Sequence, residues 1–320
     1  MSAIVTPFVQ GTPEWVDARR AGIGASEIPI IAGESPYRSA LELWAEKTGR
    51  VKPVPDAETA ELFELGHLME PVLLEIYERR TGRHPKRVRR MLAHPDVPWA
   101  LASLDAQAPV RRAVEAKWSN AARWHGDGIP DDVLMQVQWQ LFVTGWDVAD
   151  VVALVGRAAR VVEVPRDQGW IDDLYRLAAA FWERVESGIP PKPDGSESAR
   201  RTLARLHPAD DGSILAATPD LVELVDLYRS AKAAKTAAEN AEKGTGNALR
   251  AVLRDASGIE GLCTYRQSAD STRTNWPAVA SAFRQLVTGH PEDELDSIVD
   301  LHSETSPGPR VLRLSKGTLE

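Results

Sequence analysis

The sequence predicts an α/β protein in which a mixed β-sheet is flanked by helices, followed by an extension made of a long helix and a β-hairpin. Three observations support this prediction. Segments with helical spacing of apolar residues alternate with short runs of strand character through the first part of the chain. A proline-rich stretch comes next. Beyond it lies a long alanine-rich segment that starts with Thr-Pro-Asp, a typical helix entry. We therefore expect a globular domain at residues 1–195, a linker at 196–216 and an extension at 217–320.

Four segments of the first domain are predicted to be helices. Residues 39–49 and 59–82 have apolar residues at helical spacing and end in glycine, a common helix stop. Residues 131–145 start with aspartates that can cap a helix, and residues 169–188 carry a clear apolar stripe. Pro71 lies inside the second segment, and because proline disturbs a continuous helix, a kink is one expectation there.

Two pairs of strands are predicted between these helices. Residues 100–106 and 113–118 alternate in the manner of strands, and Pro109 with two arginines separates them as a hairpin turn. Residues 148–156 and 157–165 are expected to form a second pair.

The extension is expected to contain one long helix and short strands. The helix is predicted over residues 217–243, and the Gly-Thr-Gly sequence at 244–246 is expected to break it. Short strands are predicted at 263–268 and 310–316.

Composition excludes several classes of protein. The chain has 46 acidic and 38 basic residues, a net charge of −8, which argues against a surface coated with basic charge. The single cysteine, Cys263, excludes an internal disulfide and cysteine-ligated zinc or iron–sulfur sites. No Walker loop is present, which argues against hydrolysis powered by ATP. No apolar run is long enough for a membrane span and no signal peptide starts the sequence, so we expect a cytoplasmic protein without a membrane partner.

Positive charge is concentrated in one segment. Residues 79–90 hold seven lysines and arginines and no acidic residue, which leaves −15 on the rest of the chain. Such a run can neutralise several phosphates, although a solvated loop is the simpler interpretation of any charge run. If the protein binds DNA, the contact must therefore be local, in a basic groove on an otherwise repelling surface.

The residues most informative about chemistry are Asp105 and the triplet Glu115-Ala116-Lys117. Side chains alternate along a strand, so Glu115 and Lys117 should share a face, and in a hairpin Asp105 should approach Glu115. Two carboxylates and the Ala116 carbonyl are hard oxygen ligands suited to Mg²⁺ or Mn²⁺. A nearby lysine can orient a water molecule or stabilise charge on a phosphate. The competing interpretation of a lone E-x-K triplet is an edge strand with solvated charges.

Three further polar residues extend this cluster. Glu70 falls within the apolar face of its predicted helix, where a buried carboxylate needs a compensating partner; a partly exposed position at the Pro71 kink is the alternative. Gln136 and Gln140 are four residues apart and share one helix face, which suggests a polar cleft or simple exposure to solvent, while Gln138 faces elsewhere.

The order of these residues resembles the PD-(D/E)XK nuclease core, and more narrowly the YqaJ-type viral recombinase family, which includes lambda-type phage exonucleases. Three stretches support the resemblance: a W-x-x-x-R…GASE opening in 11–37, a G-x-x-x-E-P helix in 65–82, and the SLDA…VEAKW…MQVQWQ sequence in 103–145. Two positions depart from the family pattern. Leu104 stands where many such nucleases have proline, and Val133 where some relatives carry an aromatic residue.

The resemblance implies a PD-(D/E)XK, restriction-endonuclease-like fold and a specific activity. The protein would digest linear double-stranded DNA 5′→3′ by two-metal phosphodiester hydrolysis with Mg²⁺, or with Mn²⁺ as a substitute. The remaining 3′ single strand would pass to a single-strand annealing protein for recombination. A ring-shaped homotrimer is implied, acting in the cytoplasm of a bacterial host if the protein is phage-encoded.

The resemblance also assigns roles to individual residues. Asp105, Glu115 and the Ala116 carbonyl would bind the metal directly, and Glu70 would bind it through water. Lys117 would position the attacking water with help from Gln136. Arg19 and Ser26 would contact the 5′ phosphate. The residues expected to contact DNA from the basic run are Arg79, Arg80, Arg83, Lys86 and Arg87.

Two alternatives remain open at the level of sequence. The first is an adaptor that binds DNA ends without cleaving them and docks a recombination partner on the helix at 217–257. The second is a structure-specific endonuclease, which would nick closed circular DNA.

Overall fold

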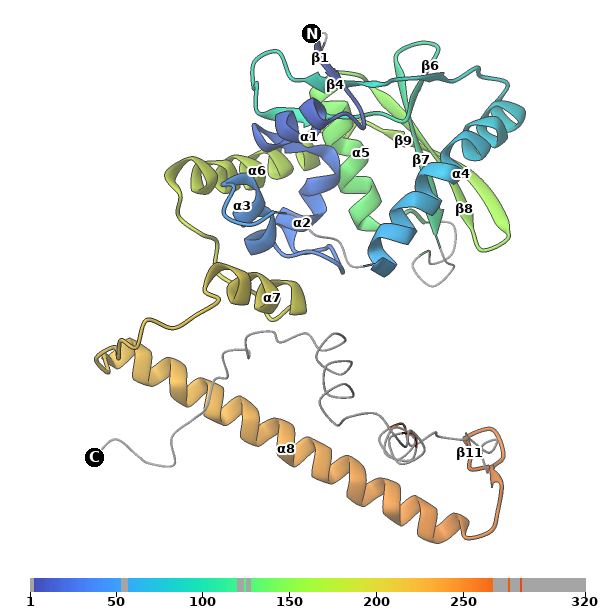
Figure 1. Cartoon of the computed structure of the whole chain (residues 1–320). Helices are drawn as coiled ribbons and strands as arrows, with labels where there is room; N and C mark the ends of the chain where they lie inside the picture. Colours follow the sequence, from blue (N-terminus) through green and yellow to red (C-terminus); the bar gives the residue numbers. More distant parts are fainter. Residues whose placement is uncertain are drawn as a thin grey trace. The chain divides into compact units, whose positions relative to one another are not determined.

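A five-stranded mixed sheet lies at the centre of the first part of the chain, in the order β3-β6-β7-β8-β9 (Figure 1). In this computed structural model, residues 3–52, 57–119, 124, 128–266, 276 and 283 are described. The five strands are β3 (Lys86–Arg87), β6 (Ala106–Ala108), β7 (Arg112–Ser119), β8 (Val148–Val155) and β9 (Ala158–Pro165). β7 and β8 run parallel, and the other neighbours are antiparallel. The predicted fold class, a mixed sheet flanked by helices, is confirmed.

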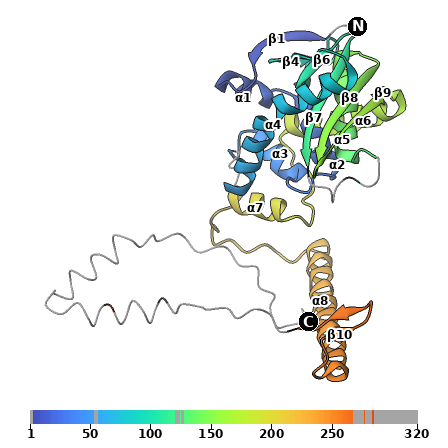
Figure 2. The ribbon, with the colours of Figure 1, turned by 90° about the vertical axis from the view of Figure 1, so that its right-hand side faces the viewer.

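Helices cover both faces of this sheet, because alternate residues of its central strands are apolar. On one face, Val114 and Val152 pack against Leu73 and Tyr77 of α4 (Ala57–Thr81). The opposite face packs into a larger core with helices α2, α3, α5 and α6. Figure 2 shows α4 on one side of β7 and β8, and α5 and α6 on the other. The helices of the larger core are α2 (Ile28–Ala32), α3 (Ala40–Lys47), α5 (Asp131–Thr144) and α6 (Gln168–Ser187).

A second, four-stranded sheet takes the order β1-β4-β5-β2. Its strands are β1 (Ile4–Val9), β4 (Arg90–Ala93), β5 (Ala100–Ala102) and β2 (Ile23–Gly24), and α1 (Pro13–Arg20) with a 3-10 turn (Ala25–Glu27) lies among them in sequence. The single strand predicted at 100–106 is wrong, since β5 ends in this sheet and β6 begins in the other. Asp105 therefore lies where the chain crosses between the two sheets and does not share a strand face with Leu101.

The helix predicted over 59–82 is confirmed, and one expectation about a helix end is wrong. α4 contains Pro71, and the turns that follow it bury Leu73, Leu74 and Tyr77 against the sheet, which offsets the backbone hydrogen bond that proline lacks. α5 is not capped by an aspartate side chain. Its N-cap residue is Pro130, whose carbonyl accepts from the Val133 N–H at 3.0 Å.

The predicted linker at 196–216 contains a helix, α7 (Glu197–Leu206). Its residue Ser198 is buried, and the Ser198 hydroxyl accepts from the Ser39 N–H at the start of α3, at 2.9 Å. The first compact unit of the chain accordingly runs from Met1 to Pro208, past the boundary expected at residue 195. Sequence composition missed α7 because its N-terminal serine and glutamate follow directly on the proline-rich stretch.

The second unit, residues 209–320, contains α8 (Pro219–Leu253) and a hairpin of β10 (Gly258–Ile259) and β11 (Cys263–Thr264). The predicted helix entry at Thr218-Pro219 is confirmed. The break expected at 244–246 is wrong, since α8 runs through both glycines. The strand expected at 310–316 lies outside the described residues.

None of the helices among the described residues combines the length and the apolar character that crossing a membrane requires.

Candidate active site

Glu115 and Lys117 form the centre of a partly buried polar cluster on β7. Lys117 Nζ lies 2.6 Å from Glu115 Oε1, as their shared strand face predicts. Gln136 of α5 joins the two side chains, because its Nε2 donates to Glu115 Oε1 at 2.7 Å and its Oε1 accepts from Lys117 Nζ at 2.9 Å. β7 is the central strand of its sheet and the Glu115 side chain is 3% exposed. The interpretation of an edge strand with solvated charges is therefore wrong.

Gln140 holds the second oxygen of the same carboxylate. It lies one turn after Gln136 and is fully buried, and its Nε2 donates to Glu115 Oε2 at 2.6 Å. Gln138 points away and binds the backbone at Pro165 and Asp167. The predicted division of the three glutamines between two helix faces is confirmed, and hydrogen bonds to Glu115 rather than solvent exposure explain Gln136 and Gln140.

Asp105 enters the cluster from the crossover between the two sheets. Its Oδ2 accepts from the Ala116 N–H at 2.8 Å, which places the Asp105 carboxylate beside Glu115 and Lys117. Burial, followed by the charge of Glu115, raises the pKa of Asp105 well above its usual value. A site that strains a carboxylate pair in this way favours an additional positive charge.

The charge of Lys117 is retained despite its surroundings. Burial lowers the pKa of a lysine, but the carboxylates of Glu115 and Asp105 outweigh that effect and raise the pKa of Lys117 above its ordinary value. Lys117 is therefore a fixed ammonium group, held between the carboxylate oxygen of Glu115 and the amide oxygen of Gln136.

The residues of this cluster fit a divalent cation that takes oxygen ligands. Asp105 and Glu115 supply carboxylates, and Ala116, next to Glu115 on β7, supplies a carbonyl. The buried Oε1 of Gln140 has no hydrogen-bond partner among the described residues, so a donor such as metal-bound water is missing beside Glu115. Across the described ranges, no group of three or more His, Cys, Asp or Glu side chains converges on one point. A metal here would consequently rest on two carboxylates, backbone and water.

Glu70 approaches the cluster from α4 but has its own partner. Its Oε1 lies 2.7 Å from Arg87 Nη2 on β3, and its side chain is 19% exposed. The negative charge of Glu70 contributes to the raised pKa of Asp105, so the two carboxylates are close enough to interact. The expected compensation for Glu70 is thus present in the form of an arginine, and the exposure leaves room for water.

The basic run of residues 79–90 does not act as one patch. Arg83 binds the buried carboxylate of Asp150, which also accepts from Tyr77 and Arg112 at 2.6 Å each. Arg83 therefore binds the sheet through Asp150, while its side chain stays 39% exposed, and its contact with DNA stays a prediction.

The other members of the run are exposed. Arg79 pairs with Glu75 on its own helix, Arg80 donates to the Ala159 carbonyl at 2.6 Å, and Lys86 lies on the surface strand β3. These side chains keep donors accessible to a ligand from solvent.

The sequence around Arg19 and Ser26 contains a buried ion pair that sequence reasoning missed. Glu27 and Lys47 have side chains 2% exposed each, and their charged atoms lie 2.7 Å apart. Glu27 also binds Arg19 at 3.2 Å, and Lys47 Nζ donates to the Arg19 carbonyl at 2.6 Å. Ser26 is exposed beside this pair. The only local signal was the spacing of Glu27 three residues after Gly24, whose N–H it accepts at 2.8 Å.

The two positions that depart from the family pattern are both apolar and buried. Leu104 and Val133 both belong to the larger core. Leu104 directly precedes Asp105 in the sequence, and Val133 lies on α5. Neither position carries a polar group that the cluster needs.

Comparison with known proteins shows that the chain is similar to a described family. The family model of the YqaJ-like viral recombinase domain matches residues 14–147, a range that includes every predicted site residue. The uncharacterized protein YqaJ of Bacillus subtilis (strain 168) is 29% identical over 252 residues, 76% of this chain and 78% of that protein.

Solved structures with a similar chain path include two exonucleases. An alkaline exonuclease from Laribacter hongkongensis aligns with a TM-score of 0.45 and 20% identity, over 61% of this chain and 100% of that chain. A phage-related exonuclease from Haemophilus somnus 129PT aligns with a TM-score of 0.42 and 13% identity, over 52% of this chain and 95% of that chain.

Proposed function

We propose that the chain, whose residues 14–147 match the model of the YqaJ-like viral recombinase domain, is a Mg²⁺-dependent exonuclease of linear double-stranded DNA. It digests one strand 5′→3′ and leaves a 3′ single strand for recombination. One observation carries the proposal: Lys117 and Gln136 bind the buried Glu115 carboxylate on the central strand, and Asp105 reaches the same strand from the crossover between the two sheets. A buried carboxylate with a second carboxylate and an ammonium group beside it is typical of a site with a chemical task.

The carboxylates of Asp105 and Glu115 and the Ala116 carbonyl would hold the metal, and Glu70 would reach it through water. Two Mg²⁺ ions are proposed, and Mn²⁺ would substitute. Bound Mg²⁺ lowers the pKa of a coordinated water and stabilises negative charge on the scissile phosphate.

The residues around the metal ligands have distinct tasks. Gln136 and Gln140 fix both oxygens of Glu115, so the carboxylate cannot rotate away from its position. Lys117 places a permanent positive charge next to the ligands, where its N–H groups can orient the attacking water or bind a phosphate oxygen. No other side chain in the cluster supplies a fixed cation.

Contacts with DNA are proposed from two places in the first unit. Arg19 and Ser26 would bind the terminal 5′ phosphate, with Arg19 held by Glu27 and stacked over the Trp15 ring at 4.9 Å. Arg79, Arg80, Lys86 and Arg87 would bind backbone phosphates.

The test compares linear with covalently closed circular duplex, each incubated with Mg²⁺ or with EDTA. Loss of linear DNA alone, and only with Mg²⁺, is the expected result. Labelling each 5′ end, with and without a terminal phosphate, reports polarity and the role of that phosphate. Intact linear DNA at protein concentrations that bind it would refute the proposal, and nicked circles would support an endonuclease instead.

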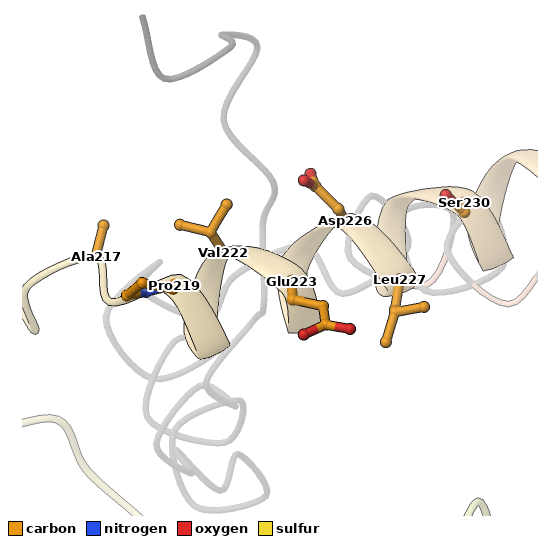
Figure 3. A pocket seen from close by; sticks show the side chains of 7 residues that line it. All are labelled: Ala217, Pro219, Val222, Glu223, Asp226, Leu227 and Ser230. Atoms are coloured by element: carbon orange, nitrogen blue, oxygen red, sulfur yellow. The ribbon is translucent and has the colours of Figure 1, made fainter.

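The second candidate function is that of a DNA-end-binding adaptor, and α8 favours it. This 35-residue helix exposes several large apolar side chains, among them Leu224 and Leu227 at 62% each. A hollow of about 600 Å³ runs along its first turns (Figure 3), where the carboxylates of Glu223 and Asp226 point to opposite sides and do not converge on a metal.

A single-strand annealing protein is the proposed partner of this surface, and a homotrimeric ring acting in the bacterial cytoplasm is the proposed assembly. The variant Leu224→Ser/Leu227→Ser should lose the partner in a pull-down with the purified annealing protein. Retained cleavage by that variant would mean an active nuclease with an adaptor segment. End binding without cleavage by the wild type would leave the adaptor alone.

A further inference from the structure

A basic groove of about 560 Å³ lies on the first unit, beside the candidate active site. Arg87, Arg89 and Arg90 line it from β3 and β4, Arg111 lines it from the turn between β6 and β7, and Trp146 lines it after the end of α5. None of its ten lining residues is acidic. A groove of this composition attracts a polyanion, because no negative charge in its lining repels a phosphate.

The groove is connected to the cluster through Arg87. The ion pair of Arg87 with Glu70 joins the groove wall to a carboxylate whose charge contributes to the raised pKa of Asp105. Arg90 Nη1 donates to the Pro7 carbonyl at 3.2 Å, which holds the guanidinium against β1. Because an arginine has five N–H donors, Arg90 can still donate to a ligand. A strand that leaves the active site along this wall meets one guanidinium after another.

The hairpin turn that carries Arg111 has an unusual backbone. Val110 and Arg111 have φ angles of 67° and 55°, the left-handed region that favours glycine and asparagine. Positive φ angles are common in the tight turns of hairpins, and this turn between β6 and β7 places the long cationic side chain of Arg111 at the groove.

Trp146 distinguishes between the nucleic acid forms that the groove can take. Its half-buried side chain offers an aromatic surface among the arginines, and an aromatic surface stacks only on a base that is not already stacked in a duplex. The volume also lies within the roughly 300–1,000 Å³ of sites that take small organic ligands, which suits a few nucleotides of one strand.

We propose that this groove binds single-stranded DNA, the strand that remains after digestion, through phosphate contacts to Arg89, Arg90 and Arg111 and base stacking on Trp146. The proposal rests on the proposed function for the source of the strand, but the binding itself does not require cleavage. Gln107, exposed on β6, adds a neutral hydrogen-bonding group to the wall.

The experiment measures binding of the full-length protein to a fluorescein-labelled oligodeoxythymidine in EDTA, by anisotropy, over a range of salt concentrations. Arg111→Asn keeps the turn, because asparagine tolerates a positive φ, and removes the charge. It should weaken binding about fivefold and reduce the slope of log Kd against log salt by about 0.7. Trp146→Leu should weaken binding about tenfold.

Arg176→Asn is the matched control, since Arg176 is an exposed arginine on α6 outside the groove and pairs with Asp173. It should leave the dissociation constant within twofold of wild type. Unchanged binding by Arg111→Asn, or an equal loss in the control, would overturn the proposal. Circular dichroism shows whether each variant folds. If Trp146→Leu does not fold, the result for Arg111→Asn, whose substitution lies on an exposed turn, decides the test.

Failure of the groove and failure of the nuclease give different results. If the wild type digests linear duplex and Arg111→Asn binds the oligonucleotide as the wild type does, the groove proposal is refuted and the nuclease proposal stands. If no DNA is digested but oligonucleotide binding depends on Arg111, the nuclease proposal is refuted and the groove proposal stands.

Discussion

Gln140 donates its amide N–H to Glu115 at 2.6 Å, while its own amide oxygen has no hydrogen-bond partner among the described residues. A buried amide oxygen without a donor costs free energy, and that cost disappears if a water molecule held by a metal donates to it. Gln140 thus contacts the Glu115 carboxylate with its amide N–H group and can accept from metal-bound water with its amide oxygen.

We expect Gln140→Leu to weaken metal binding more than it weakens the fold. The variant frees one oxygen of Glu115 and removes the acceptor for metal-bound water, and losses of such supporting contacts cost about 10- to 100-fold in metal affinity or activity. The measurement is the Mg²⁺ concentration that gives half-maximal cleavage of linear duplex. A variant with the wild-type Mg²⁺ requirement would contradict the role of Gln140.

Lys117→Met should lower the rate of cleavage about 10²- to 10³-fold, because it removes the fixed charge beside the metal ligands while keeping the length of the side chain. Duplex binding, measured with Ca²⁺ in place of Mg²⁺, should change little. Lys235→Met, on the exposed surface of α8, is the control and should cleave at the wild-type rate. Equal activity of the two variants would exclude Lys117 from the chemistry.

Mg²⁺ should stabilise the folded protein, because its charge offsets the burial and then the repulsion by Glu115 that raise the pKa of Asp105. At 100 times the dissociation constant the gain is about 2.7 kcal/mol in the free energy of unfolding. The melting temperature should therefore rise with Mg²⁺ and fall back with EDTA, and Glu115→Gln should abolish most of the rise. A rise that survives this substitution would place the stabilising ion elsewhere.

Sequence patterns predicted the parts of the site that depend on local geometry. Strand alternation correctly paired Glu115 with Lys117, and helical periodicity correctly separated Gln136 from Gln138. The same patterns failed where the chain changes partners, since the apolar run of 100–106 gives no sign that it crosses from one sheet to another at Asp105.

The other failures have two separate causes. The ion pair of Glu27 and Lys47 is a tertiary contact between two segments 20 residues apart, and neither residue has a distinctive sequence environment. α8 runs through 244–246 although little of it is buried, so the length of the helix, and not packing, outweighs the two glycines.

Lys47→Met should destabilise the protein by about 3–5 kcal/mol, because it leaves the Glu27 carboxylate buried with a more distant partner, Arg19. Glu27→Gln/Lys47→Met should recover part of that loss, since the double variant buries no unpaired charge. Urea unfolding of the two single variants and the double variant gives the coupling energy. Additive losses would mean that the pair contributes through packing alone.

Tyr77 should give the protein a defined alkaline limit of stability. Burial, and then the hydrogen bond to Asp150 at 2.6 Å, raises the pKa of Tyr77 from 10.0 to about 12. A raised pKa in the folded state means that the neutral phenol is favoured there, so this contribution to stability is fully present below pH 10 and is lost as the pH rises toward about 12.

The unfolding free energy of the wild type should therefore fall between these two pH values by more than that of Tyr77→Phe, which has no phenol to ionise. At neutral pH the same variant should cost about 1–2 kcal/mol, because Asp150 keeps Arg83 and Arg112 but loses one donor. Urea unfolding at a series of pH values measures both effects. If the stabilities of the two proteins fell in parallel above pH 10, ionisation of Tyr77 would not be coupled to the fold.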